Sequence, residues 1–330
     1  MNSTPSAFLF ELPKPVAVLE SEIREQLAAS LTHIAEQVQP AQEIDTALVD
    51  TVCAQIRSHR VDPAVFAGYQ SVLDEVQQQR YTELPRIFAH LKKLSAEPAT
   101  FFIQRFSKET LGDDAAFFSD IIFSKDFGKE PIRDPGLELY EATRKDLEEA
   151  FDLIENVAPE AANEIQTLWS RIFVGEASSG GNSRSFAGVT SFLLWGSSFI
   201  NAAAHKTRID CADYLIHEST HALLFALSAS EPLVLNKLSE RYPSPLRRDP
   251  RPMDGIYHAT LVCGRLIVFL KKVRASSLIR DADHPIIEEK LRNLMQAFSD
   301  GVETVREFGK LSDPGASFLD QIDSRVRAES

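Results

Sequence analysis

Cysteine is scarce in this chain of 330 residues. Its three cysteines, Cys53, Cys211 and Cys263, lie far apart in the sequence and form no C-x-x-C pair. This usage favours a reducing compartment, in which each thiol serves as a small buried hydrophobic group. We therefore expect a cytoplasmic protein.

Long apolar runs and an excess of basic charge are also missing. No apolar run reaches the length that a bilayer-spanning helix needs, and residues 1–14 lack the basic start and long apolar segment of a secretory signal. The chain has 35 Lys and Arg against 48 Asp and Glu, a formal net charge of −13. These features argue against a membrane partner and against nucleic acid, whose phosphates attract basic surfaces.

Hydrophobic residues make up 44% of the chain, which is typical of a globular protein with a substantial core. Helical periodicity covers most of the sequence, beginning with segments at residues 16–38, 43–61 and 64–93. We expect residues 1–95 to form a helical N-terminal portion. Residues 96–330 should form a mostly helical catalytic domain that contains the motif described below.

A small β element is expected in the middle of the chain. A Gly/Ser-rich loop at residues 178–183 precedes two short strand-like runs at 186–195 and 198–203. The predicted fold is therefore mainly α, with a small β-hairpin ahead of a long apolar helix that Thr207 or Asp210 would cap. The hairpin could form the edge of a cleft for an extended peptide, or it could merely cover that helix.

The apolar helix carries the sequence His217-Glu218-Ser219-Thr220-His221. Residues four apart project from the same face of a helix, so both imidazoles can reach one metal ion. Glu218 lies about 100° further round the helix. There it can orient a ligand or act as a base beside a metal-bound water. We predict a metal site here, because two incidental histidines on so apolar a helix are a poor alternative.

Two histidines do not complete a metal site, so a third ligand must come from elsewhere. A metzincin would have a histidine six residues after His221, but Leu227 stands there and excludes that class. In other H-E-x-x-H peptidases a glutamate from a following helix completes the site, and Glu231 and Glu240 are the nearest candidates. Neither lies in an apolar helical frame, whereas His258 does.

His258 is therefore the preferred third ligand. An inward-facing histidine on its own would more often be a core residue, but the upstream pair needs a further ligand. Asp254, four residues earlier, is the reserve carboxylate ligand. His205 is a weaker candidate and His284 a weaker one still.

The second unusual feature is a group of four arginines within eleven residues of an acidic chain: Arg241, Arg247, Arg248 and Arg251. Neighbouring prolines stiffen the segment and keep it extended. Guanidinium groups on a stiff segment suit bidentate binding of carboxylates. A solvated basic loop is the alternative, and Arg251, just ahead of the His258 helix, has the best position for pointing into the site.

The motifs LIHESTHALL (residues 215–224), SPLR (244–247) and RPMDGIYH (251–258) together resemble the HEXXH-motif peptide-modification family. Its members are described as α-ketoglutarate-dependent HExxH-type peptide β-hydroxylases of ribosomal-peptide biosynthesis. The resemblance extends over roughly residues 138–269, and the paired motifs are its specific part. It implies a non-haem Fe(II) oxygenase on a largely helical scaffold instead of a jelly-roll barrel.

The resemblance also implies a set of ligands. His217, His221 and His258 would hold Fe(II), with open positions for the cosubstrate and O₂. A carboxylate is the usual third ligand of facial-triad iron enzymes, so Asp254 remains open beside His258.

The cosubstrate would be 2-oxoglutarate. Arg251, with Arg247 as the second choice, would pair with its distal carboxylate, and Glu218 would orient a ligand or a bound water. The reaction would hydroxylate a β-carbon in a ribosomally synthesised precursor peptide while 2-oxoglutarate yields succinate and CO₂.

Two other classes of protein fit the same motif. A zinc metallopeptidase would use Glu218 as the general base toward a zinc-bound water. The arginine segment and His258 favour the oxygenase, because a peptidase needs no pocket for a dicarboxylate. A peptide-binding or maturation-partner protein with a structural metal site would be expected to lack Glu218 or a ligand, and none is missing.

Overall fold

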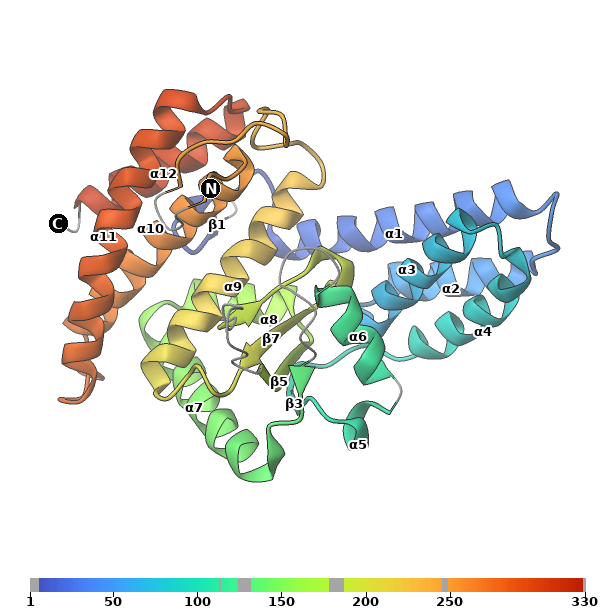
Figure 1. Cartoon of the computed structure of the whole chain (residues 1–330), viewed down its shortest axis with the longest axis horizontal. Coiled ribbons are helices and arrows are strands. Elements are labelled where there is room, and N and C mark those ends of the chain that lie inside the picture. The colour runs from blue at the N-terminus through green and yellow to red at the C-terminus, as the bar shows by residue number, and fades with distance from the viewer. Residues whose placement is uncertain (1–5, 113, 124–131, 178–186, 245–248, 329–330) are drawn as a thin grey trace, which may run out of the picture. The chain divides into compact units, whose positions relative to one another are not determined.

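The computed structural model describes residues 6–112, 114–123, 132–177, 187–244 and 249–328. Helices make up 66% of the structure (Figure 1), and the described residues form twelve helices and a small sheet of about five strands. The mainly α fold predicted from the sequence is confirmed, and the fold is not a jelly-roll barrel.

The chain divides into two compact units, each assembled from separate stretches of sequence. The motif unit contains Met1–Val16, Lys145–Ile165 and Lys206–Ser330, and the sheet unit contains Ala17–Arg144 and Gln166–His205. The predicted division at residue 95 therefore falls inside the sheet unit. Hydrophobic periodicity identifies helices, but which helices share a core depends on contacts between residues far apart in the chain.

The helices predicted near the N-terminus are present. They are α1 (Val16–Val38), α2 (Thr46–Ser58), α3 (Pro63–Gln77) and α4 (Leu84–Leu94), with the short 3-10 helix η1 (Tyr81–Glu83) before α4. The third predicted segment thus forms two helices instead of one. Asp62 caps α3 by accepting a hydrogen bond from the Ala64 backbone N–H, and Pro63 occupies the first helical position.

The β-strands of the sheet unit form one mixed sheet. Its order is β3 (Phe102–Arg105), β5 (Arg171–Ala177), β7 (Ser197–Asn201) and β6 (Gly188–Val189), and β4 (Ile132–Arg133) also pairs with β5. Helices α5 (Lys108–Leu111) and α6 (Asp114–Phe123) follow β3 in the chain, and α7 (Gly136–Val157), most of which belongs to the motif unit, follows β4. β3, β5 and β7 are parallel, whereas β4 and β6 run antiparallel to their partners.

The predicted hairpin is only part of this sheet. β6 pairs with β7 as expected, with Gly188 opposite Ile200. The 3-10 helix η2 (Phe192–Leu194) replaces the end of the first predicted strand, and β7 also pairs with β5. Parallel pairing joins segments that are distant in sequence, so local alternation of residues does not reveal it.

Aromatic rings form the core beside the sheet. Phe173 stacks on Phe199 with ring centroids 4.6 Å apart, Phe106 lies 5.5 Å from Phe199, and Phe118 lies 5.7 Å from Phe173. All four side chains are buried. Ring pairs of this kind stabilise a core beyond the burial of their surface.

The motif unit is a helical assembly with a short hairpin. It contains β1 (Ser6–Ala7), β2 (Phe10–Glu11), most of α8 (Pro159–Leu168), and α9 (Arg208–Ser228), α10 (Met253–Ala275), α11 (Asp283–Phe308) and α12 (Asp313–Ala328). α10 packs against α9, α11 and α12. Thr207 caps α9 by accepting a hydrogen bond from the Asp210 N–H at 3.1 Å, which confirms the first of the two predicted caps.

α10 is long and apolar enough to cross a membrane, alone among the helices of the described residues. The prediction that no run reaches this length was wrong for α10. In the structure 83% of its most apolar stretch is buried inside the protein, and Arg265 is itself fully buried. A helix enclosed by other helices has to be apolar on most sides.

The three cysteines are free and buried, as expected for small hydrophobic groups. Burial raises the pKa of each thiol, and it raises the pKa of Cys263 to about 12. The thiols are therefore protonated and unreactive at neutral pH.

We expect the substitution Gly264→Ala to destabilise the motif unit. A Cβ atom at this position of α10 would meet Ile322 of α12 and would lie 2.8 Å from Cε2 of Phe298 in α11. Such overpacking should lower the free energy of unfolding by about 1–3 kcal/mol, measured by urea denaturation.

Gly255→Ala is the matched control on the same helix, because a Cβ atom there meets no other atom within 4 Å. It should leave the stability unchanged or raise it by up to about 1 kcal/mol through helix propensity. Equal destabilisation by both substitutions would contradict the close packing at Gly264.

Candidate metal site

The motif residues occupy one strip of α9. His217, His221 and Phe225, each four residues apart, are partly exposed, whereas most of the helix around them is buried. Glu218 lies outside this strip and is buried, with 6% of its surface exposed. The spacing predicted from the sequence therefore presents both imidazoles on one accessible face of the helix.

His258 of α10 lies beside this strip. The ring centroids of His217 and His221 are 5.1 Å apart, and those of His221 and His258 are 5.7 Å apart with nearly parallel planes. Nδ1 of His221 lies 3.4 Å from Nδ1 of His258. The structure thus brings together the two motif histidines and the histidine that the sequence selected from α10.

The two Nδ1 atoms form a long hydrogen-bond contact between the imidazoles, and their distance also falls within the spacing of two ligands of one metal ion. Two nitrogens that each bind one ion at about 2.1 Å lie roughly 3.0–3.5 Å apart. Within the described part of the chain, no group of three or more His, Cys, Asp and Glu side chains is arranged to hold a metal ion. His221 and His258 therefore form a pair of suitable spacing, and adding His217 requires rotation of its side chain.

The pKa of each imidazole of the pair is lowered, which favours the neutral form. Burial lowers the pKa of His221 well below its usual value, and the neighbouring His217 and His258 lower it further. Burial also lowers the pKa of His258, although Asp254 acts in the opposite direction. Neutral imidazole is the form that binds metal ions.

Asp254, the reserve ligand, lies on the other side of the His258 ring. Its Oδ1 is 3.8 Å from Nε2 of His258, and half of its side-chain surface is exposed. Nδ1 of the same ring faces His221. Asp254 therefore lies within ion-pair distance of His258 without a hydrogen bond, on the side of the ring away from His221.

The weaker ligand candidates lie in other surroundings. His205 belongs to the sheet unit, where its Nε2 is 2.8 Å from the carbonyl oxygen of Ala187. His284 and Glu231 are exposed. Glu240 accepts a hydrogen bond from the hydroxyl of Tyr242 at 2.7 Å.

Arg251 lies in a loop that is closed by its own backbone. Its N–H and C=O groups each form a 2.9 Å hydrogen bond with Tyr242, two residues before α10 begins. Nε of Arg251 lies 3.0 Å from Oδ2 of Asp249, and one third of the side chain is exposed. The described residues give its two terminal nitrogens no hydrogen-bond partner. Arg247, the second choice for the cosubstrate, lies outside the described residues.

Phe225 is a site residue that sequence analysis missed. Its ring centroid lies 6.4 Å from that of His221 and 5.6 Å from that of His258. The signal was its position four residues after His221, which continues the line of the motif along α9.

A buried network behind the motif was also missed. Nη1 and Nη2 of Arg265 donate to the two carboxylate oxygens of Glu164 at 2.9 and 2.8 Å, and both side chains are fully buried. Nη1 also donates to the hydroxyl of Thr220, inside the motif, at 3.2 Å. The network therefore connects α8, α9 and α10. The only local sign of this network in the sequence was a charged residue, Arg265, within the apolar sequence of α10.

No family model matches the chain, and a search among curated proteins finds no match. The functional argument therefore depends on the residues themselves and on their geometry.

We expect Glu164→Gln to destabilise the protein strongly, because it leaves the Arg265 guanidinium buried without a counter-charge. The free energy of unfolding in chemical denaturation should fall by about 3–5 kcal/mol. The double variant Glu164→Leu with Arg265→Met should recover much of this loss, since it removes both charges.

Glu288→Gln provides the control within the motif unit. Glu288 forms an exposed ion pair with Arg274 at 3.1 Å, so its loss should change the stability by no more than about 1 kcal/mol. A Glu164→Gln protein as stable as the Glu288→Gln protein would show that the buried pair is not needed for the fold.

Proposed function

We propose that this protein is an Fe(II)- and 2-oxoglutarate-dependent hydroxylase that acts on the β-carbon of a residue in a precursor peptide. The observation that carries the proposal is the pairing of His221 on α9 with His258 on α10, with nitrogens 3.4 Å apart and His217 one turn away. Nitrogen ligands on facing helices suit a divalent transition metal.

His217, His221 and His258 would hold the metal, and Asp254 would fix the orientation of the His258 ring. Bound Fe(II) would supply the redox chemistry, in which O₂ and 2-oxoglutarate yield succinate, CO₂ and a hydroxyl group on the peptide. Phe225, which contacts two of the imidazoles, would keep water away from one side of the site.

Arg251 would bind the distal carboxylate of 2-oxoglutarate. Asp249 lies 3.0 Å from its Nε as an ion-pair partner without a hydrogen bond, and a guanidinium has two terminal nitrogens that can bind a carboxylate in bidentate fashion. Glu218, buried beside the motif histidines, would orient a ligand or a bound water.

A zinc metallopeptidase is the second candidate function. It is favoured by the position of Glu218 between the two motif histidines, where a carboxylate can act as the general base toward a zinc-bound water. The two functions differ in the metal, in the product and in the role of Arg251, and experiments can separate them.

The first expected outcome concerns metal binding. Anaerobically reconstituted protein should bind about one Fe(II) per chain by elemental analysis, and His221→Ala or His258→Ala should abolish most of this binding, since each removes a ligand. His284→Ala, which changes an exposed histidine of the same unit, should bind the metal normally. Equal iron binding by the His258→Ala and His284→Ala proteins would exclude His258 as a ligand.

The second expected outcome concerns the cosubstrate. The iron-loaded protein should release succinate from 2-oxoglutarate, and Arg251→Ala should raise the KM for 2-oxoglutarate by roughly 10–100-fold, because it removes a charge-assisted pair of hydrogen bonds. Bound iron should not change in this variant. Arg274→Ala, which alters an exposed arginine of the same unit, is the control.

The opposite result would be equally clear. Tightly bound zinc, no succinate, and peptide cleavage that disappears in Glu218→Gln would identify a metallopeptidase.

A further inference from the structure

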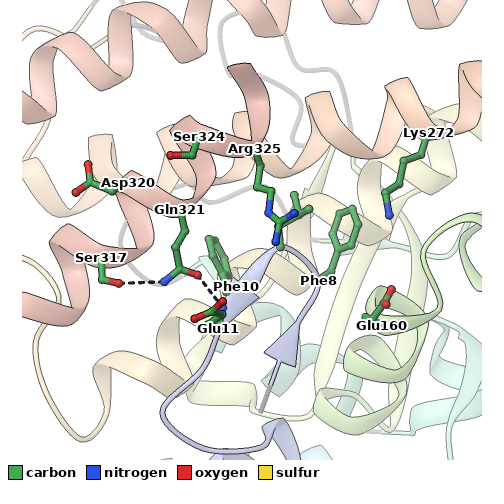
Figure 2. A pocket seen from close by; sticks show the side chains of 11 residues that line it. Phe8, Phe10, Glu11, Glu160, Lys272, Ser317, Asp320, Gln321, Ser324 and Arg325 are labelled. Atoms are coloured by element: carbon green, nitrogen blue, oxygen red, sulfur yellow. Dashed lines mark hydrogen bonds between the residues drawn. The ribbon is translucent and has the colours of Figure 1, made fainter. Parts of the chain in front are cut away.

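The motif unit contains a large pocket that none of the proposed metal chemistry uses. It has a volume of about 850 Å³ and lies among the β1–β2 hairpin, α8, α10 and α12 (Figure 2). This volume falls in the range of about 300–1,000 Å³ that small-molecule and peptide side-chain sites occupy.

The floor of the pocket is formed by the turn of the hairpin. Phe8 and Phe10 line it, and both rings lie 5.4 Å from the guanidinium of Arg265 on their buried side. Leu9, between them, has a φ of 71°. Leu9 is the second residue of the two-residue turn between β1 and β2, and a positive φ is part of the geometry of such tight turns.

One wall of the pocket carries two cations. Lys272 of α10 and Arg325 of α12 both point into the pocket in Figure 2, and the Lys272 ammonium lies 5.4 Å from the centroid of the Phe8 ring. The described residues give neither cation an ion pair. Arg327, two residues further along α12, differs in this respect because it pairs with Asp323 at 2.8 Å.

The opposite wall carries two carboxylates. Glu160 of α8 lies across from Lys272, and Glu11 of β2 lies below Arg325 (Figure 2). Asp320 also lines the pocket, but it points away from the cations and lies 3.5 Å from Arg306. Gln321 is fixed between the walls, since it accepts from the Glu11 N–H at 2.7 Å and donates to Ser317 at 3.0 Å.

This arrangement selects the charge of a ligand. A purely anionic ligand would be attracted by the cations and repelled by the facing carboxylates. A purely cationic ligand would be attracted by the carboxylates and repelled by the cations. A ligand that carries both charges can satisfy both walls at once. The volume is larger than a single amino acid fills and fits a short peptide segment.

We propose that this pocket binds a short peptide segment with neighbouring acidic and basic side chains. The acidic groups contact Lys272 and Arg325, and the basic groups contact Glu160 and Glu11. Binding needs neither metal nor cosubstrate, so the inference goes beyond the proposed function and does not depend on it. If the hydroxylase proposal is also correct, the pocket holds a second segment of the peptide that is modified.

The test is fluorescence anisotropy on the metal-free full-length protein with labelled, end-capped octapeptides. Four peptides are compared. The first alternates Glu and Lys, the second contains only Glu, the third contains only Lys, and the fourth has Gln in place of every charged residue. The alternating peptide should bind at least about tenfold more tightly than each of the others, and its affinity should fall at high salt.

Single substitutions test whether the peptide binds in this pocket. Arg325→Gln and Glu160→Gln should each weaken the alternating peptide by about tenfold. Both residues are exposed, so the fold should persist, and circular dichroism checks this. Arg327→Gln, on the same helix but outside the pocket, should bind within about twofold of the unaltered protein.

Two results would overturn the proposal. One is equal affinity for the all-Glu and the alternating peptide, because the carboxylate wall would then be irrelevant. The other is the absence of measurable binding by any probe. Since neither result involves metal or succinate, the hydroxylase proposal is judged separately.

Discussion

A fully buried ion pair joins helices of the motif unit, and neither of its charges can lose its partner without a large cost. Glu164 and Arg265 both have no exposed side-chain surface, and two parallel hydrogen bonds join them. Removing both charges from water is costly, and the bidentate geometry offsets much of that cost. The rings of Phe8 and Phe10, each 5.4 Å from the guanidinium, add cation–π attraction. Arg265, which lies on α10, therefore contacts α8, α9 and the N-terminal hairpin.

The same arginine acts on the site through Thr220. This residue lies inside the motif, faces the core, and accepts a hydrogen bond from Arg265. The opposite strip of α9 carries His217, His221 and Phe225, which remain partly exposed. Because α9 is anchored on its buried side to α10, the distance between His221 and His258 follows from helix packing. A site built on rigid elements in this way holds its ligands more closely than one built on loops.

The hairpin at the N-terminus has two faces with different roles. One face of Phe8 and Phe10 covers the buried arginine, and the pocket lies beside the same two residues. The chain is acidic as a whole, yet Lys272 and Arg325 come together here from two helices. Net charge describes the average surface of a protein, and local fields depend on which side chains the fold makes neighbours.

The amino-acid sequence by itself determined the features that depend on short separations along the chain. These are most of the helices, the cap at Thr207, the imidazole pair at i and i+4, and the position of His258 on an apolar helix. Each follows from periodicity or hydrogen bonding within a few residues. Only the tertiary structure decided which segments share a core, that β3, β5 and β7 lie parallel, and that Glu164 meets Arg265 across 101 positions of sequence. It also brought His258 of α10 beside His221 of α9, 37 positions earlier in the sequence. Contacts of this kind depend on the packing of whole elements, which no local pattern of residues encodes.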